Sequence, residues 1–179
     1  MSTDRLTPFS YVVLTLVGSD GAGPHDLVLM ARSGRGVYWD AAESQWYAEP
    51  KRLHELGYLD AREEPGRTRA RTHYSLTAKG RKALGDWMRE PAQFPRIQHE
   101  AVCRLLAADL LGEAPVLESL KGLHADLAEL RERLDAADAR AEEIPHRAPY
   151  LHLNHRLARR IVDAHEEWLA EVERELGGG

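Results

Sequence analysis

The 179-residue sequence contains a single cysteine, Cys103. One thiol cannot form a disulfide within the chain, and it cannot supply a cluster of thiolate metal ligands. The fold must therefore be stabilised by its hydrophobic core. With 43% hydrophobic and 30% charged residues, the composition is that of a folded globular protein.

Long hydrophobic runs are also missing. The longest apolar stretch, residues 11–17, is much shorter than the roughly 20 residues that a transmembrane helix needs. The N-terminus has no basic segment followed by an apolar run, as a secretory signal would have. We therefore expect a cytoplasmic protein that does not interact with membranes.

Sequence motifs of common enzyme classes are absent as well. There is no His-Glu-x-x-His, no glycine-rich phosphate-binding motif and no nucleophile elbow. His146, His152 and His155 form the densest histidine group, and two imidazoles on one helical turn could bind a divalent metal. Histidines at this spacing more often belong to a polar surface. The sequence therefore predicts no enzyme, no cofactor and no metal site.

The charges are distributed unevenly along the chain. Residues 1–90 carry 13 Lys and Arg against 12 Asp and Glu, whereas residues 91–179 carry 11 against 17. Within residues 66–85 there are six basic residues and no acidic one. A surface that binds a polyanion is expected in this segment, in spite of the net charge of −5.

The first half of the sequence alternates helical patterns with turn signals. Hydrophobic spacing predicts helices over residues 6–17, 24–32 and 41–56, a two-stranded hairpin over 58–64 and 72–76, and a helix over 78–87 after the N-cap Thr77. Pro50 is expected to bend the third helix or to delay its start. This order is that of a winged helix-turn-helix domain, in which the third helix enters the major groove of DNA. Its predicted core contains Trp46, Leu53, Leu56, Tyr74 and Leu76.

The second half reads as almost entirely helical. A helix is expected over residues 96–111, and leucines then recur every three or four residues from Leu117 to Leu134, in a long helix that ends near Ile144. A last helix, residues 150–176, is expected to pack antiparallel to the long one. The residues predicted on its apolar face are Leu153, Leu157, Ile161, Ala164, Trp168 and Val172. The predicted fold is thus mainly α, with a winged-helix domain at 1–90 and a helical dimerisation domain at 91–179.

Several short motifs resemble those of the PadR-like transcriptional regulators. The third helix contains Ser44-Gln-Trp-Tyr47 and Lys51-Arg-Leu53, its end runs into Leu56-Gly-Tyr-Leu59, and the second strand of the wing leads into the fourth helix through Tyr74-Ser-Leu-Thr77-Ala-Lys-Gly80. The resemblance covers residues 6–88. It implies a homodimer that binds double-stranded operator DNA of two-fold symmetry, usually as a repressor, and that a small-molecule effector releases.

Residue roles follow from the resemblance by position. The residues predicted to contact DNA are Ser44, Gln45, Tyr47, Lys51 and Arg52 from the third helix, and Arg67, Arg69 and Arg71 from the wing. Trp87, Phe94 and Trp168 are candidates for lining an effector pocket, because aromatic side chains line many ligand clefts. Ordinary core packing is the alternative for these three. A different function for the whole chain is that of a protein-interaction adaptor built on a winged helix and a coiled-coil scaffold.

Overall fold

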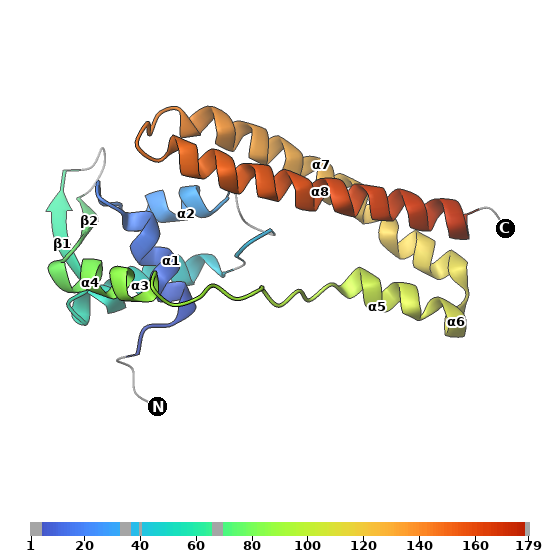
Figure 1. Cartoon of the computed structure of the whole chain (residues 1–179), viewed down its shortest axis with the longest axis horizontal. Helices are drawn as coiled ribbons and strands as arrows, with labels where there is room; N and C mark the ends of the chain where they lie inside the picture. Colours follow the sequence, from blue (N-terminus) through green and yellow to red (C-terminus); the bar gives the residue numbers. More distant parts are fainter. Residues whose placement is uncertain (1–4, 33–36, 40, 66–69, 178–179) are drawn as a thin grey trace. The chain divides into compact units, whose positions relative to one another are not determined.

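The computed structural model describes residues 5–32, 37–39, 41–65 and 70–177 (Figure 1). The chain divides into two compact units. The first contains the described residues up to Arg32 and from Trp39 to Gln93, and the second contains Val37, Tyr38 and the described residues from Phe94 onward. In the described part of the chain, no helix combines the length and the hydrophobicity needed to cross a membrane.

The first unit has the predicted order of helix, helix, helix, hairpin and helix. Its two strands pair antiparallel, with Leu59 opposite Leu76 at one end of the ladder and Glu64 opposite Arg71 at the other. The prediction of a winged helix-turn-helix is therefore confirmed. The elements are α1 (Pro8–Val17), α2 (Pro24–Arg32), α3 (Glu43–Glu55), β1 (Leu59–Glu64), β2 (Arg71–Leu76) and α4 (Ala78–Trp87).

Threonine caps fix the starts of α1 and α4. Thr7 Oγ1 accepts a hydrogen bond from the Ser10 N–H at 3.2 Å, and Ser10 Oγ accepts one from the Thr7 N–H at 2.9 Å. Thr77 Oγ1 accepts one from the Gly80 N–H at 3.0 Å, as its predicted role as N-cap requires. These bonds satisfy N–H groups that the first turn of a helix leaves without partners.

The wing is attached to the helices by backbone hydrogen bonds. Ala22, in the turn between α1 and α2, exchanges two of them with Tyr74 of β2, at 2.9 and 3.0 Å. Gly21 precedes this bridge with φ of +76°, a conformation that favours glycine. The hairpin is therefore positioned by the helical core as well as by its own ladder.

The core of the first unit contains most of the residues that the sequence predicted. Trp46, Leu53, Tyr74 and Leu76 are buried, whereas Leu56 is only half-buried. Pro50 is fully buried inside α3, and the helix continues around it from Glu43 to Glu55. The remaining buried hydrophobic residues of this core are Val13, Leu14, Val17, Ala22, Leu27, Val28 and Leu59.

The described residues of the second unit form four helices. The prediction of one helix over residues 96–111 is wrong, because residues 96–99 precede the first helix and a break at Ala107 divides the segment. The break lets both short helices place an apolar residue against the core, Leu105 from α5 and Ala108 from α6. The helices are α5 (Glu100–Leu106), α6 (Ala108–Leu111), α7 (Glu113–Ala141) and α8 (Ala148–Leu176).

Helices α7 and α8 form an antiparallel pair, as the sequence predicted. Polar contacts join the two helices, and as the residue number increases along α7 the number of its partner on α8 decreases. These contacts are His124 with Glu173, Arg131 with Asp163, and Asp135 with Arg159. Their buried hydrophobic residues include Leu120, Leu127, Leu130, Leu134, Ala158, Val162, Leu169 and Val172.

The apolar face predicted for α8 is only partly correct. Val172 is buried and Ile161 and Trp168 are half-buried, whereas Leu153 and Leu157 are 56% and 52% exposed and Ala164 is also exposed. The other residues buried along α8 are Ala148, His155, Ala158, Val162 and Leu169. Several of these also follow each other at spacings of three and four, so periodicity alone could not identify the packed face. The helix therefore carries a second apolar surface that its own unit leaves exposed.

Candidate nucleic-acid interface

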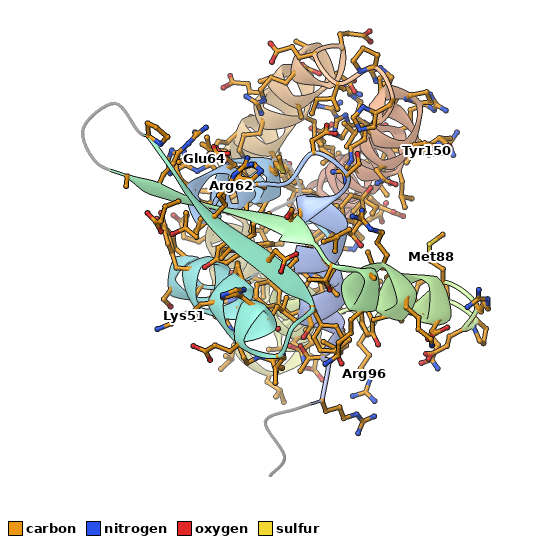
Figure 2. The ribbon with its side chains drawn as sticks, turned by 90° about the vertical axis from the view of Figure 1, so that its left-hand side faces the viewer. Lys51, Arg62, Glu64, Met88, Arg96 and Tyr150 are labelled. Carbon is orange, nitrogen blue, oxygen red and sulfur yellow. The ribbon has the colours of Figure 1, made fainter. Side chains whose placement is uncertain are left out.

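One face of α3 is polar and exposed, and the opposite face anchors the helix. Ser44, Tyr47 and Lys51 are exposed and spaced by three and four residues, so they lie along one side of the helix. Trp46 and Leu53 are buried on the other side. Figure 2 shows the Lys51 side chain pointing outward from α3. This arrangement presents polar groups on a helix whose orientation is fixed by the core.

Gln45 is exposed and also caps the start of α3. The Ala42 N–H donates a hydrogen bond to Gln45 Oε1 at 3.0 Å. A glutamine that reads adenine uses both its side-chain oxygen and its side-chain nitrogen. With one lone pair of Oε1 used by the cap, the second lone pair and the side-chain NH₂ of Gln45 are the groups available to a base.

Arg52 belongs to a network that connects α3 with α1. Its Nε and Nη2 donate to the two carboxylate oxygens of Glu49 at 2.9 and 2.7 Å, and Nη2 also donates to Ser10 Oγ at 3.0 Å. Ser10 is fully buried and donates to Glu49 Oε1 at 2.6 Å. The guanidinium thus helps to hold the helix in place.

The basic character of the wing is partly neutralised by Glu64. Arg62 Nη2 lies 2.7 Å from Glu64 Oε1, and Arg71 Nη2 lies 3.4 Å from Glu64 Oε2. The hydrogen bond from Arg62 lowers the pKa of the Glu64 carboxyl below its ordinary value. Figure 2 shows Arg62 and Glu64 close together on the hairpin. Of the predicted wing arginines, Arg71 is exposed, whereas Arg67 and Arg69 lie outside the described residues.

Arg62, whose side chain is 76% exposed, was not among the predicted DNA contacts. It lies on β1, before the basic segment of residues 66–85, and two residues before Glu64, so that both side chains lie on one face of the strand. Its pairing opposite His73 in the ladder places it beside the other strand of the wing. The two-residue spacing of Arg62 and Glu64 on the first strand is the feature of the sequence that could have indicated this exposed arginine.

Two of the predicted basic residues have structural contacts on α4. Lys79 Nζ donates to the Leu56 carbonyl oxygen at 2.7 Å and lies 4.3 Å from the centre of the Tyr58 ring. Lys82 forms an ion pair with Asp86 at 2.5 Å. Lys79 and Lys82 are both exposed, but each has a partner within the protein.

The three aromatic residues predicted for an effector pocket belong to different units. Trp87 stacks on Tyr11 in the first unit, with ring centres 4.8 Å apart. In the second unit, Phe94 is 86% exposed, and Trp168 is half-buried and meets the His99 ring edge-on at 5.5 Å. Neither unit by itself brings the three together.

The His99 ring stacks on His165, with ring centres 4.9 Å apart. Burial and the proximity of His165 lower the pKa of His99 below its ordinary value of 6.5. This aromatic group lies where the segment leading into α5 meets α8. Because its pKa is lowered, His99 is favoured in its neutral form in the folded second unit.

A winged helix with an exposed polar third helix, followed by long antiparallel helices, defines a class of DNA-binding folds. A scan against protein-family models and a search of curated proteins each found no match for this chain. Solved structures do match over nearly the whole length. The operator complex of Bacillus subtilis PadR has a TM-score of 0.71 and 18% identity, covering 97% of this chain and 98% of that chain.

Two further matches agree with this assignment of the fold. The Vibrio cholerae virulence activator AphA has a TM-score of 0.72 and 25% identity, covering 94% of this chain and 97% of its own. The PadR-like regulator BC1756 from Bacillus cereus has a TM-score of 0.67 and 12% identity, and the match covers 99% of this chain and 98% of that chain. The chain has the fold of the PadR-like transcriptional regulators. The resemblance seen in its short motifs is thus confirmed at the level of the fold.

Proposed function

We propose that this chain is a cytoplasmic, homodimeric transcription regulator that binds double-stranded operator DNA. The observation that carries the proposal is the exposed polar stripe of Ser44, Tyr47 and Lys51 on a helix anchored by Trp46 and Leu53. A third helix of this kind is what a winged helix inserts into the major groove. The solved complex of Bacillus subtilis PadR with operator DNA supports this use of the fold.

The proposed division of labour follows the chemistry of the side chains. Lys51 and the wing arginines Arg67, Arg69 and Arg71 contact phosphates, because cations bind the DNA backbone without reading its sequence. Ser44, Gln45 and Tyr47 supply contacts that depend on sequence. For Arg52, the bonds to Glu49 and Ser10 favour a positioning role over the direct contact predicted from the sequence.

The proposed dimer buries the apolar surface that the second unit leaves exposed. On α8, Tyr150, Leu153 and Leu157 are exposed at spacings of three and four residues. Exposed apolar patches of this kind mark interaction sites. A second copy of the chain is the proposed occupant, because it also brings the second winged helix that a two-fold operator requires. Other large hydrophobic residues exposed in this unit include Phe94, Ile97, Val102, Leu106, Leu110 and Leu111.

The proposed regulator is a repressor, and a small aromatic molecule releases it from DNA. A further solved structure is that of Bacillus subtilis PadR in complex with p-coumaric acid, which supports a ligand-binding role for this fold. Trp87, Phe94 and Trp168 remain the candidate ligand contacts. An effector of this kind acts only if it binds the DNA-competent and DNA-incompetent states with different affinities.

Fluorescence anisotropy with the DNA upstream of the chain's own coding sequence, against a scrambled duplex, tests the proposal. The upstream duplex is expected to bind at least about 10³-fold more tightly, with an affinity that falls steeply as salt rises. Replacing Arg67, Arg69 and Arg71 with alanine should weaken binding to both duplexes, whereas Gln45→Ala should reduce mainly the difference between them. Equal losses on both duplexes for both variants would contradict the assigned roles. Absence of binding to either duplex at low salt would favour the adaptor.

A further inference from the structure

Near the turn that connects α7 and α8, three side chains direct possible metal-ligand atoms toward one another. Asp138 comes from the end of α7, and His152 and His155 come from the first turns of α8. His155 Nδ1 lies 2.6 Å and His152 Nδ1 lies 3.0 Å from the same atom, Asp138 Oδ1. All three ligand atoms lie within 4.8 Å of one another.

The charges at this cluster are well defined. Arg159 Nη1 pairs with the other carboxylate oxygen of Asp138, Oδ2, and Arg159 Nη2 lies 2.8 Å from Asp135 Oδ1. Burial of Asp138 opposes its ionisation, but hydrogen bonds from His155, His152 and Arg159 lower its pKa to about 2. Oδ1 of Asp138 thus faces both imidazole Nδ1 atoms, which donate to it, and Oδ2 faces the Arg159 guanidinium.

Two of the three separations between these atoms are close to those of a metal site, and the third, between the two imidazole nitrogens, is at most 4.8 Å. Ligands bound about 2.0–2.1 Å from a Zn²⁺ ion in tetrahedral geometry lie about 3.3 Å apart. The two observed nitrogen-to-oxygen distances of 2.6 and 3.0 Å would need to grow by less than 1 Å. The side chain of His155 is only 9% exposed, whereas those of His152 and Asp138 are 30% and 29% exposed. The cluster is thus anchored on one side and reachable from solvent on the other.

An outer group orients one of the histidines. His152 Nε2 donates to Glu142 Oε1 at 2.8 Å, while its Nδ1 points to Asp138. Histidines that bind metals commonly donate their second N–H to a carboxylate, which fixes the orientation of the ring. By comparison, His124 and Glu173 form a simple two-residue contact of 2.8 Å between the same two helices. The group at Asp138 therefore has both a set of converging ligands and a supporting partner.

We propose that Asp138, His152 and His155 bind a divalent transition-metal ion of the zinc type. Two imidazole nitrogens and one carboxylate oxygen favour such an ion over Mg²⁺ or Ca²⁺, which prefer ligand sets made of oxygen. Water completes the coordination on the solvent side, and the displaced Nδ1 protons go to solvent. Because the ligands come from two helices, the bound ion joins the end of α7 to the start of α8.

Histidine spacing in the sequence is not sufficient to identify this cluster. By spacing, His152 and His155 belong with His146, and a polar surface was predicted for all three. The third ligand, Asp138, lies 14 residues before His152 and on the other helix. The antiparallel packing of α7 and α8 brings it to the two imidazoles.

Metal binding can be measured on the untagged full-length chain after treatment with EDTA and dialysis. Isothermal titration with Zn²⁺ is expected to give one ion per chain, and Co²⁺ is expected to give visible absorption bands that Zn²⁺ abolishes. His152→Gln should remove this binding, and Glu142→Gln should weaken it about 10–100-fold because the supporting carboxylate is lost. His124→Gln is the matched control, since it removes an imidazole from the same helix pair and should leave Zn²⁺ binding unchanged.

Circular dichroism of each variant shows whether its helices are intact, and the partly exposed position of His152 makes it the safest ligand to replace. The inference is overturned if the wild type binds no more Zn²⁺ than His152→Gln. Loss of the same amount of binding in His124→Gln would overturn it as well. Neither readout involves DNA, so its outcome is independent of the proposed regulatory function.

Discussion

The network that connects α3 with α1 leads to a quantitative expectation for Glu49→Ala. The substitution removes the acceptor of three hydrogen bonds, one from Ser10 and two from Arg52, at 2.6 to 2.9 Å. Hydrogen bonds to charged groups contribute about 1.5–3 kcal/mol each, but three that share one carboxylate are not additive. Arg52 also regains water, because its side chain is 27% exposed. We expect the free energy of unfolding of the first unit to fall by about 2–3 kcal/mol.

A double substitution separates this network from general damage to the helix. Ser10→Ala alone should cost about 1–2 kcal/mol, because it removes both the bond to Glu49 and the acceptor of the Thr7 N–H, whereas adding it to Glu49→Ala should cost less, because only the capping bond is then lost. The reason is that Glu49→Ala already leaves the buried Ser10 hydroxyl without its carboxylate acceptor, and Ser10→Ala removes that hydroxyl. Glu55→Ala, at an exposed position on the same helix, serves as the control and should change stability by less than about 0.5 kcal/mol.

Urea unfolding followed by tryptophan fluorescence is the suitable assay. Trp46 is buried in the core of the first unit, and Trp39 and Trp87 belong to the same unit, so the signal reports mainly on it. A loss below about 0.5 kcal/mol for Glu49→Ala would refute the structural role given to the network. Strict additivity of the two substitutions would refute the coupling between Ser10 and Glu49.

Three further expectations concern the packing of both units. Leu134→Ala, at a position only 1% exposed in the second unit, should cost about 2–5 kcal/mol in chemical denaturation, and a loss below 1 kcal/mol would contradict its place in the core. Gly80→Ala should destabilise α4 by about 1–3 kcal/mol, because its Cβ would lie 2.2 Å from the Tyr58 carbonyl oxygen. Gly85→Ala on the same helix meets no atom within 4 Å and should stabilise the unit by about 0.5–1 kcal/mol, so equal effects of the two in thermal melts would refute this contrast. Because the pKa of His99 is lowered in the folded state, the folded state binds fewer protons there than the unfolded state below about pH 6.5. The free energy of unfolding is therefore unaffected by this group above about pH 6.5 and decreases as the pH falls from there through the folded pKa. Melting temperatures at about pH 8 and about pH 5 should therefore differ less in His99→Phe than in the wild type, and an unchanged difference would contradict this expectation.

The sequence predicted the first unit well because its signals are local. Thr77 marks where α4 starts, and Trp46 and Leu53 identify the buried side of α3 by spacing alone. A capping hydrogen bond or a helical stripe involves residues only three or four positions apart. Such features can be read without knowledge of the rest of the fold.

Features that depend on distant partners were not predictable in this way. Arg52 has the chemistry of a DNA contact, but its guanidinium is directed to Ser10, 42 residues earlier. Helix α8 has two apolar faces, and either could have been the packed one on spacing alone. Packing against α7 buries the face with Ala158 and Val162 and leaves the face with Leu153 exposed. The convergence of Asp138 with two histidines likewise depends on how two helices align. In each case the deciding neighbour lies on another element.

The most direct test of DNA recognition through α3 compares two lysines by the salt dependence of DNA binding. Lys51→Ala and Lys121→Ala remove the same charge, the first from the exposed face of α3 and the second from an exposed position on α7. Fluorescence anisotropy over a range of salt concentrations gives the slope of log affinity against log salt. For Lys51→Ala the slope is predicted to become shallower by about 0.9, the value of one phosphate contact, and for Lys121→Ala it is predicted not to change. Equal slopes in the wild type and both variants, or a change only in Lys121→Ala, would contradict binding of DNA through α3.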